Sequence, residues 1–505
     1  MSNLLQKVLC GSLLVWASLP PESDAAPSAV PEAVPLEALI VGGGPDENSN
    51  AAQIEGHVRF VTHLLPAAAK RRVLFADGKP ENASVSYADT GAAADAQRAL
   101  AVLLQQNGPD EPLLLRKPEL GTPTDGPSSR DAIHRAITDL LPKAGGKPAA
   151  PLLLYFAGHG GPNEDKKEED TEYNLWNHKP LAVHDLSMEI ARLPPDTPVV
   201  LVMAQCYSGA FANLLFRKGD PHGELAPQDL AGFFSARNDR EASGCGWNTG
   251  SADYQDFSSY FFGALCGHDR FGHPVTGTDF NRDGHITLHE AFCYALSHDE
   301  SFDTPTCTSY LFLRRFVGLP DAKIYGMPYA EAWQAATSAQ RAALDALSQK
   351  LGLGGENRAL AAWDRLMFQD PQGTPAELAS YREATDRLST MRQAALESLF
   401  QRWPVLRWKN EKAGYSQAMD GAAKELAGNK SLSSDLREAG DASDRADAAM
   451  EEEEARLMRF IDLYAGVVLA KHLRENGEKA VKANFARLWA AEQQSLPLGE
   501  APAAR

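Results

Sequence analysis

The sequence lacks an excess of positive charge and, beyond its first residues, a long hydrophobic run. Its 505 residues include 49 lysines and arginines against 67 aspartates and glutamates, which gives a formal net charge of -18 at pH 7. Because nucleic acids and anionic membrane surfaces attract basic proteins, we expect neither as a general partner. No internal segment predicts a membrane span, since the best of them, residues 460–470, is short and contains Asp462.

A complete dinucleotide-binding fingerprint is also missing. The glycine cluster Gly42-Gly-Gly44 has Glu47 where the third glycine of that fingerprint would stand, and no convincing acidic partner for a ribose follows at the required spacing. The incomplete pattern argues against a dinucleotide site at this glycine turn. What is present is typical of a globular protein, since 44% of the residues are hydrophobic, and the length predicts two or three domains.

The amino end has the pattern of an export signal. Lys7 precedes an apolar stretch over residues 8–19, and small residues follow up to Ala26. This pattern predicts a signal peptide over residues 1–26, followed by a Pro/Ala linker over residues 27–36. We therefore expect an exported protein, periplasmic or secreted, of bacterial origin.

Cysteine is scarce, with six in the whole chain. If Cys10 leaves with the signal peptide, five remain, and an odd number in an exported protein indicates a free thiol or a bond to another chain. Cys206 is the natural free thiol. The other four are expected to form at least one disulfide, with the connectivity open: Cys245, Cys266, Cys293 and Cys307.

Strand and helix patterns alternate along the first part of the chain. Apolar runs rich in strand formers predict strands at residues 36–41, 72–76, 152–156, 199–203 and 230–235. Helical spacing predicts helices at residues 51–65, 131–141 and 184–193, with Ser128 and Ser129 as candidate caps of the second. This alternation predicts an α/β fold with an open, mostly parallel sheet flanked by helices.

The amino-acid composition changes after about Pro328, where strand patterns disappear and Ala, Gln, Glu, Arg and Leu dominate. Helical periodicity at residues 342–351, 376–400 and 451–473 predicts a separate all-helical region over 328–505. Residues 428–450 are polar and are expected to be mobile.

Two stretches carry the chemistry: Tyr155-Phe-Ala-Gly-His-Gly160 and Met203-Ala-Gln-Cys-Tyr-Ser-Gly209. In each, a predicted buried strand ends at a turn with one reactive side chain, His159 or Cys206. Because the carboxyl ends of parallel strands meet at one edge of a sheet, a base and a thiol are expected there together. The helix-like segment after Cys206 is expected to lower the pKa of its thiol. The pattern predicts a cysteine-nucleophile hydrolase, most naturally a peptidase.

These motifs resemble those of a clan of caspase-like cysteine peptidases that includes legumains, metacaspases, gingipains and caspases. The resemblance is strongest to bacterial relatives of the legumains and covers about residues 36–318, not the helical region. It rests on Tyr155–Gly161 and Gln205–Gly209, with weaker support from residues 41–44, 74–78 and 235–243.

The resemblance implies a thiol protease with a Cys-His dyad and no third member. Cys206 would attack the scissile carbonyl, and His159 would act as base and then protonate the leaving amine. The amides of Gly160 and Cys206 would form the oxyanion hole. Legumains also carry a helical carboxyl-terminal prodomain that covers the active site, so a similar role for residues 328–505 predicts that their deletion raises turnover.

The same resemblance says little about specificity. The position two residues before the nucleophile, which is Glu, Asp or Gln in legumains, metacaspases and caspases, is Ala204 here. Ser243 and Asp256 lie where legumain-like sequences place other residues of the substrate pocket. Asp256 would favour a basic or amide side chain in the substrate, although a surface role is an equal alternative.

A second motif, Asp279-Phe-Asn-Arg-Asp-Gly-His-Ile-Thr-Leu-His-Glu290, fits the twelve-residue calcium loop of EF-hands. A helix over 288–296 should follow, while residues 272–277 are a poor helix, so we expect a lone loop with one structural calcium of the weak extracellular class. The expected ligands are the side chains of Asp279, Asn281, Asp283 and Glu290, the carbonyl of His285, and Thr287 through water.

The sequence thus predicts an exported, legumain-like cysteine endopeptidase acting on a peptide or protein substrate. It would comprise a peptidase domain over 37–320, containing the calcium loop 279–290, and a helical domain over 328–505. Three alternatives stay open: a transpeptidase or ligase, a catalytically silent binding module of the same fold, and a calcium-dependent structural protein.

Overall fold

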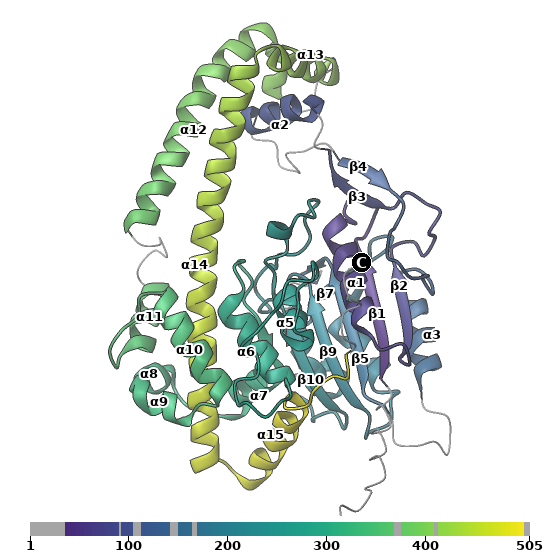
Figure 1. Cartoon of the computed structure of the whole chain (residues 1–505), viewed down its shortest axis with the longest axis vertical. Helices are drawn as coiled ribbons and strands as arrows, with labels where there is room; N and C mark the ends of the chain where they lie inside the picture. The colour runs from purple at the N-terminus through teal and green to yellow at the C-terminus, as the bar shows by residue number, and fades with distance from the viewer. Residues whose placement is uncertain are drawn as a thin grey trace, which may run out of the picture. The chain divides into compact units, whose positions relative to one another are not determined.

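The computed structural model describes residues 36–89, 92–104, 113–141, 150–163, 169–367, 375–408 and 413–498. The predicted signal peptide, and the predicted linker except for Leu36, lie outside these residues. The described chain confirms the predicted fold class, because a mostly parallel sheet is flanked by helices and followed by a long helical region (Figure 1).

The main sheet has six strands in the order β11-β10-β9-β5-β1-β2, and only the short β11 is antiparallel to its neighbour. β1, β5, β9 and β10 are buried as near-continuous apolar runs, which is expected when helices cover both faces of a parallel sheet, whereas the edge strand β2 begins with three more exposed basic residues. The strands are β1 (Glu37–Gly43), β2 (Lys70–Phe75), β5 (Leu152–Gly158), β9 (Pro198–Ala204), β10 (Asp229–Phe234) and β11 (Thr306–Cys307).

The helices expected between the strands are present, and Ser129 caps α3 by accepting the amide of Ala132. The helix expected after the calcium motif is also confirmed as α6. These helices of the α/β part are α1 (Ala52–Leu64), α3 (Arg130–Leu140), α4 (Val183–Ile190), α5 (Phe257–Cys266), α6 (Leu288–His298) and α7 (Thr308–Phe316).

Smaller elements lie between them. A two-stranded sheet of β3 (Val85–Ala88) and β4 (Leu113–Arg116) flanks an inserted helix, α2 (Ala92–Leu104). A three-stranded sheet follows β5 directly and consists of β6 (Gly160–Gly161), β7 (Glu172–Leu175) and β8 (Lys179–Ala182). The sequence patterns had not indicated either of these sheets or α2.

The carboxyl-terminal region is helical, as expected. Its longer elements are α10 (Ser338–Lys350), α11 (Arg358–Met367), α12 (Pro375–Arg402), α13 (Tyr415–Gly428), α14 (Lys430–Asn476) and α15 (Lys479–Glu492), preceded by the short α8 (Asp321–Tyr325) and α9 (Tyr329–Ala335). Within residues 428–450, which are expected to be mobile, residues 430–450 form most of the first half of the 47-residue α14. Leu436 and Ala439 of this half are buried, and Gly440 lies against Val102 of α2.

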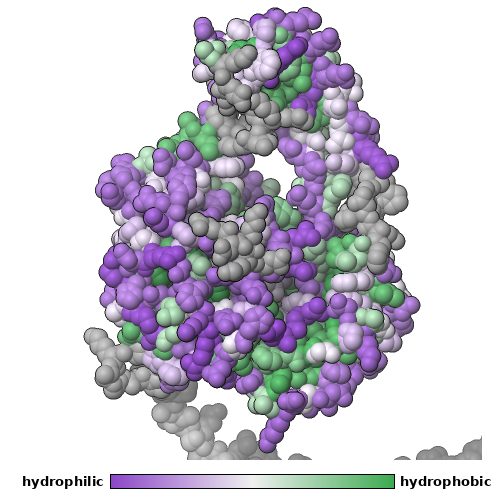
Figure 2. Space-filling model, turned by 180° about the vertical axis from the view of Figure 1, so that it is seen from behind, coloured by the Kyte–Doolittle hydropathy of each residue, from purple (hydrophilic) through white to green (hydrophobic). Residues whose placement is uncertain are grey.

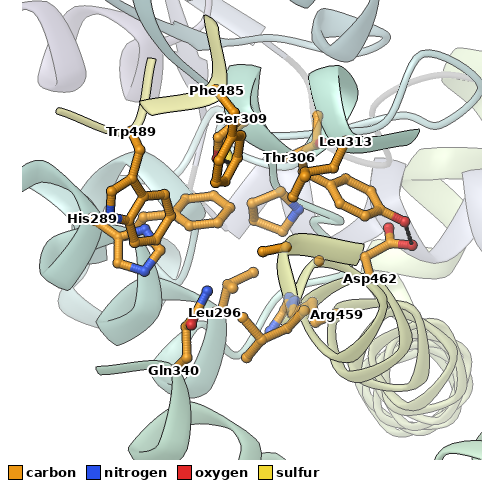
Figure 3. Close-up of a pocket in the computed structure, with 17 residues that line it drawn as sticks. His289, Leu296, Thr306, Ser309, Leu313, Gln340, Arg459, Asp462, Phe485 and Trp489 are labelled. Carbon is orange, nitrogen blue, oxygen red and sulfur yellow. Dashed lines mark hydrogen bonds between the residues drawn. The ribbon is translucent and has the colours of Figure 1, made fainter. Parts of the chain in front are cut away.

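The described residues form two hydrophobic cores. The first contains the main sheet and its helices together with the second half of α14, from Leu457 to Leu473, and Leu488 of α15. The second joins α2 to α12, α13 and the first half of α14. In the first core, a cavity of about 40 Å³ remains where α6, α7, α14 and α15 meet (Figure 3).

The face drawn in Figure 2 is predominantly hydrophilic, with smaller hydrophobic patches between. Across the described residues, no helix combines the length and the apolar character that a membrane crossing needs.

Candidate active site

The strands that carry His159 and Cys206 are neighbours. β5 and β9 pair in parallel, with Ala157 opposite Ala204, and each functional residue follows its alanine by two positions. Both therefore lie at the carboxyl edge of the sheet, as the sequence predicted. Gly160 lies so close to the nucleophile's turn that a Cβ there would be 2.2 Å from the Cys206 carbonyl oxygen, so only glycine fits.

His159 is oriented by a main-chain carbonyl. Its Nε2 lies 2.8 Å from the carbonyl oxygen of Ser49, in the loop after β1. Since a carbonyl can only accept, Nε2 carries the hydrogen and the neutral ring keeps its lone pair on Nδ1. Burial lowers the pKa of His159, which keeps the imidazole neutral and able to act as a base. No sequence pattern points to this carbonyl, because it belongs to the backbone and has no residue signature.

Cys206 sits at a strained turn. Tyr207, the next residue, is left-handed with φ 58° and ψ 18°, and its amide donates to the Arg240 carbonyl at 2.7 Å. Such a conformation costs on the order of 1–3 kcal/mol for a residue with a side chain, so the surroundings must hold it. The Cys206 Sγ accepts the amide of Ala242 at 3.3 Å.

The expected lowering of the Cys206 pKa is contradicted. Burial, reinforced by the nearby Cys245 thiol, raises the pKa of Cys206 to about 12. The segment that follows is a 3₁₀-helix, Ser208–Leu215. The positive electrostatic potential at its amino end would lower the Cys206 pKa, but the loss of solvent around the thiol has the larger effect and raises it. Burial thus favours the uncharged form of both groups, a thiol at Cys206 and a neutral imidazole at His159.

A second thiol lies close to the site. The Cys245 Sγ is 3.1 Å from the carbonyl oxygen of Gly158, the residue before His159, and burial raises the pKa of Cys245 to about 12. All five cysteines of the described residues have free thiols, so the expected disulfides are not formed in this structure. The sequence did not point to Cys245 as a neighbour of His159 and Cys206.

The three candidate pocket residues are placed differently from one another. Ala204 ends β9 and is 7% exposed. Ser243 lies one residue beyond the amide that contacts Cys206, and both its amide and its hydroxyl donate to the Asp303 carboxylate, at 2.6 and 2.9 Å. Asp256 is buried at the start of α5, where it accepts the amide and hydroxyl of Ser259 and lies 3.7 Å from His57. Its carboxylate is thus engaged inside the protein.

In the loop 279–290 the acidic side chains accept hydrogen bonds from backbone amides of the same loop. Asp279 accepts the amides of Asp283 and Gly284, at 3.1 and 3.0 Å, and Gly284 is left-handed with φ 86°. Glu290 reaches back to accept the amides of Phe280 and Asn281, at 3.0 and 3.3 Å, while its other oxygen accepts the amide of Thr287. The two ends of the motif therefore meet around residues 280–284.

The remaining expected ligands follow the same arrangement. Asn281 Oδ1 accepts the amide of Asp283, and Asp283 Oδ1 accepts the amide of His285, both at 2.9 Å. These oxygens are the donor type that calcium prefers. Within the described residues, no group of three or more His, Cys, Asp or Glu side chains is placed to hold a metal ion.

Comparison with known proteins finds no matching family model and no matching curated protein.

Proposed function

We propose that the protein is a cysteine endopeptidase of the caspase-like clan, most similar to legumains, that is exported and hydrolyses peptide bonds. The observation that carries the proposal is the register of β5 and β9, which brings His159 and Cys206 to one edge of the sheet. The Ser49 carbonyl supports it further, because it leaves Nδ1 of His159 as the basic nitrogen.

The proposed reaction begins with attack of the Cys206 sulfur on the scissile carbonyl carbon, while Nδ1 of His159 takes the thiol proton. The amides of Gly160 and Cys206 then stabilise the oxyanion. When the tetrahedral intermediate collapses, the C–N bond breaks and His159 returns the proton to the departing amine. Water, deprotonated by the same imidazole, hydrolyses the thioester and releases the carboxylate and the free thiol.

The proposal is tested with a peptide electrophile and a peptide substrate library on the full chain. The wild type should give an adduct on Cys206, located by mass spectrometry, and should cleave library members. Cys206→Ala should abolish both, and His159→Ala should lower kcat by about 10²- to 10⁴-fold. Cys245→Ser is the matched control for the second thiol and should keep the Cys206 adduct. A folded wild type with no adduct on Cys206 would instead identify a silent binding module.

An added amine separates hydrolysis from acyl transfer. A transpeptidase would convert the thioester into an amide with the amine, whereas an endopeptidase releases mainly the carboxylate. Mass spectrometry of the products with and without the amine distinguishes the two.

We also propose that loop 279–290 binds one structural calcium ion. The support is the meeting of Asp279 and Glu290 over the loop backbone, together with an oxygen-only donor set. With a dissociation constant on the order of 10⁻⁴–10⁻³ M, 5 mM calcium should add about 1–2 kcal/mol to the free energy of unfolding.

Thermal melts of protein freed of metal by a chelator, with and without added calcium, test this. Asp279→Asn and Glu290→Gln should remove the calcium-dependent rise in Tm. Asp364→Asn, which changes an exposed carboxylate on α11, is the matched control and should keep it. Melts of the wild type that do not respond to calcium would contradict the proposal.

A further inference from the structure

Arg459 of α14 is a fully buried arginine without an assigned role. Its side chain has no exposed surface, and it lines the cavity between α14 and the helices of the α/β part (Figure 3). Burying a guanidinium is unfavourable unless every donor and the charge are matched. The partners of Arg459 therefore show what the buried charge holds in place.

Those partners are main-chain carbonyls of the loop that follows α6. Nε donates to the Asp303 carbonyl at 2.7 Å, Nη1 to the Asp299 carbonyl at 2.5 Å, and Nη2 to the Ser301 carbonyl. Nη2 also lies 3.3 Å from Oδ1 of Asp299, a carboxylate with no exposed surface. One planar fork thus fixes three carbonyls of a five-residue segment, a geometry that a lysine ammonium does not reproduce.

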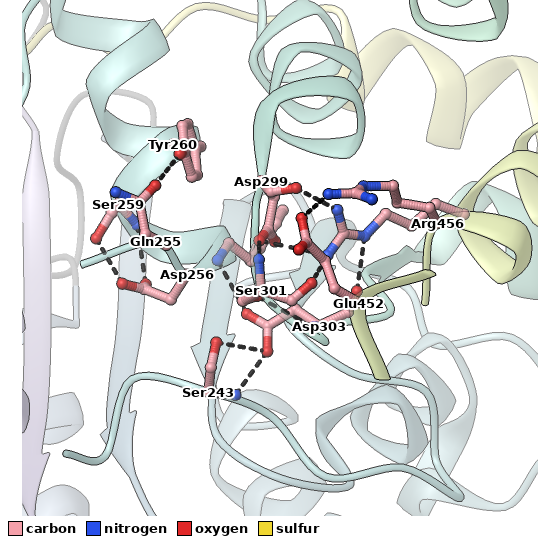
Figure 4. Close-up of polar contacts among 12 residues, drawn as sticks. Ser243, Gln255, Asp256, Ser259, Tyr260, Asp299, Ser301, Asp303, Glu452 and Arg456 are labelled. Atoms are coloured by element: carbon pink, nitrogen blue, oxygen red, sulfur yellow. Dashed lines mark hydrogen bonds and ion pairs between the residues drawn. The ribbon is translucent and has the colours of Figure 1, made fainter. Parts of the chain in front are cut away.

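The loop fixed by Arg459 in turn holds the segment beside the nucleophile. Asp303 is completely buried, and its Oδ1 accepts both the amide and the hydroxyl of Ser243, while its Oδ2 accepts the amide of Phe257 at 2.9 Å (Figure 4). Ser243 directly follows Ala242, whose amide donates to the Cys206 sulfur. Three hydrogen-bonded contacts, joined by the covalent structure of Asp303 and of residues 242–243, therefore connect α14 to the thiol.

Two further contacts of α14 reach the same segment. Glu454 pairs with Arg240 at 2.8 Å, and the Arg240 carbonyl accepts the amide of Tyr207, the strained residue after Cys206. Asp462 lies 3.6 Å from Arg237. We define residues 237–243 as the nucleophile-support loop, because their contacts lie on both sides of Cys206.

We propose that Arg459 is a positioning residue for the nucleophile, acting through Asp303 and Ser243 to hold the Ala242 amide on the Cys206 sulfur. This inference rests on the proposed function and gives the helical region a role other than the expected covering one, because α14 supports the active site.

The physical consequence concerns the thiolate. An amide donating to sulfur favours the ionised thiol, and it opposes the effect of burial on the pKa of Cys206. Losing the fork removes the three hydrogen bonds that hold the loop 299–303 and takes the guanidinium away from the buried Asp299 side chain, 3.3 Å from it. The Ala242 amide then no longer has a fixed position relative to the sulfur as negative charge develops.

Arg459→Lys in the full chain tests the proposal, with two readouts that a purely structural role would not change. We expect kcat/KM for a cleaved peptide to fall by about 10- to 100-fold, mostly in kcat. We also expect the pH profile for iodoacetamide alkylation of Cys206, followed by mass spectrometry, to move to higher pH. Asp303→Asn should give the same two changes with a smaller disturbance of the core, and it decides the question if Arg459→Lys does not fold.

Tyr464→Phe is the matched control. Its hydroxyl donates to the Met327 carbonyl, so the substitution removes one partly buried hydrogen bond of the same helix outside the nucleophile-support loop. It should lower Tm while keeping kcat/KM within about twofold and the alkylation profile unchanged.

The outcomes separate this inference from the proposed function. Folded Arg459→Lys and Asp303→Asn proteins with wild-type kcat and an unshifted profile would overturn the positioning role alone. A wild type whose Cys206 forms no adduct with the peptide electrophile would overturn the peptidase proposal itself.

Discussion

The two hydrophobic cores of the molecule are built differently, although α14 runs through both. The first core buries ionisable side chains of the carboxyl-terminal helices among apolar ones. Arg459 is one, and Glu492 of α15 is another, accepting the amide and hydroxyl of Ser309 and the hydroxyl of Thr308. The second core consists of alanines, leucines and one tyrosine, and the buried Ser433 side chain that bonds to the Leu426 carbonyl beside it is polar but not ionisable.

The difference between the two cores shows which kind of contact can hold reactive side chains in a defined position. Hydrogen bonds are directional and fix a loop to within a fraction of an ångström, whereas apolar contacts are nearly non-directional and mainly exclude water. We therefore expect disturbance of the first core to alter the reactivity of Cys206. Disturbance of the second should loosen helices and leave the reaction almost unchanged.

The largest expected effect comes from deleting the helix common to both cores. A chain that ends at Asn429 loses the α14 residues that pack in the sheet's core, among them Phe460 and Val468. Truncating one large buried side chain already costs about 2–5 kcal/mol, and folded domains have only about 5–15 kcal/mol in total. We expect circular dichroism to show no cooperative melt. A well-folded truncated protein with raised turnover would instead support a covering role for the helices.

A smaller effect concerns pH and Glu492. Burial raises the pKa of Glu492 to about 7, against 4.5 for a solvated glutamate. Between these values the folded state holds a proton that the unfolded state has released, so this group makes the free energy of unfolding fall as pH rises from about 4.5 to about 7, by at most about 3 kcal/mol. Denaturant titrations of the wild type and Glu492→Gln across this range measure it. The variant should have the flatter profile, and identical slopes would show that Glu492 does not hold the proton.

The smallest effect is expected in the second core. A Cβ on Gly440 of α14 would lie 3.1 Å from Cγ2 of Val102, so α14 and α2 approach closely at this point. Gly440→Leu overpacks the contact and should cost about 1–3 kcal/mol locally. Hydrogen exchange should quicken across α2 while kcat/KM remains unchanged. Gly440→Ala is the graded control, and a large loss of kcat/KM in the leucine variant would mean that the second core also positions the site.

Local patterns predicted the fold well. The apolar runs at residues 152–156 and 199–203 became β5 and β9 with the expected parallel neighbours, and the calcium motif was followed by α6. These predictions succeed because an apolar run, a helix cap or a turn residue depends mainly on its local surroundings in the fold. The catalytic candidates were found for the same reason, since each stands at the end of a readable strand.

Long-range partners could not be predicted in this way. Arg459 looks like any polar residue of an amphipathic helix, and its acceptors are main-chain carbonyls about 156 residues away in sequence. The helix over residues 430–450 was not predicted, because its partner, α2, lies in an insertion whose helical pattern was itself missed. The Cys206 pKa was misjudged because burial depends on the whole fold.

The Ser49 carbonyl has a consequence for mutational tolerance. Because the contact that orients His159 comes from the main chain, replacing the side chain of Ser49 should leave the base in place. The vulnerable positions are those that shape the backbone. A Cβ on Gly44 would lie 2.4 Å from that same carbonyl oxygen, and the buried Asn50 side chain accepts the amide of Gly44 and donates to the Ser84 carbonyl. The orientation of the His159 ring thus depends on Gly44 and Asn50, which shape the loop that presents the Ser49 carbonyl.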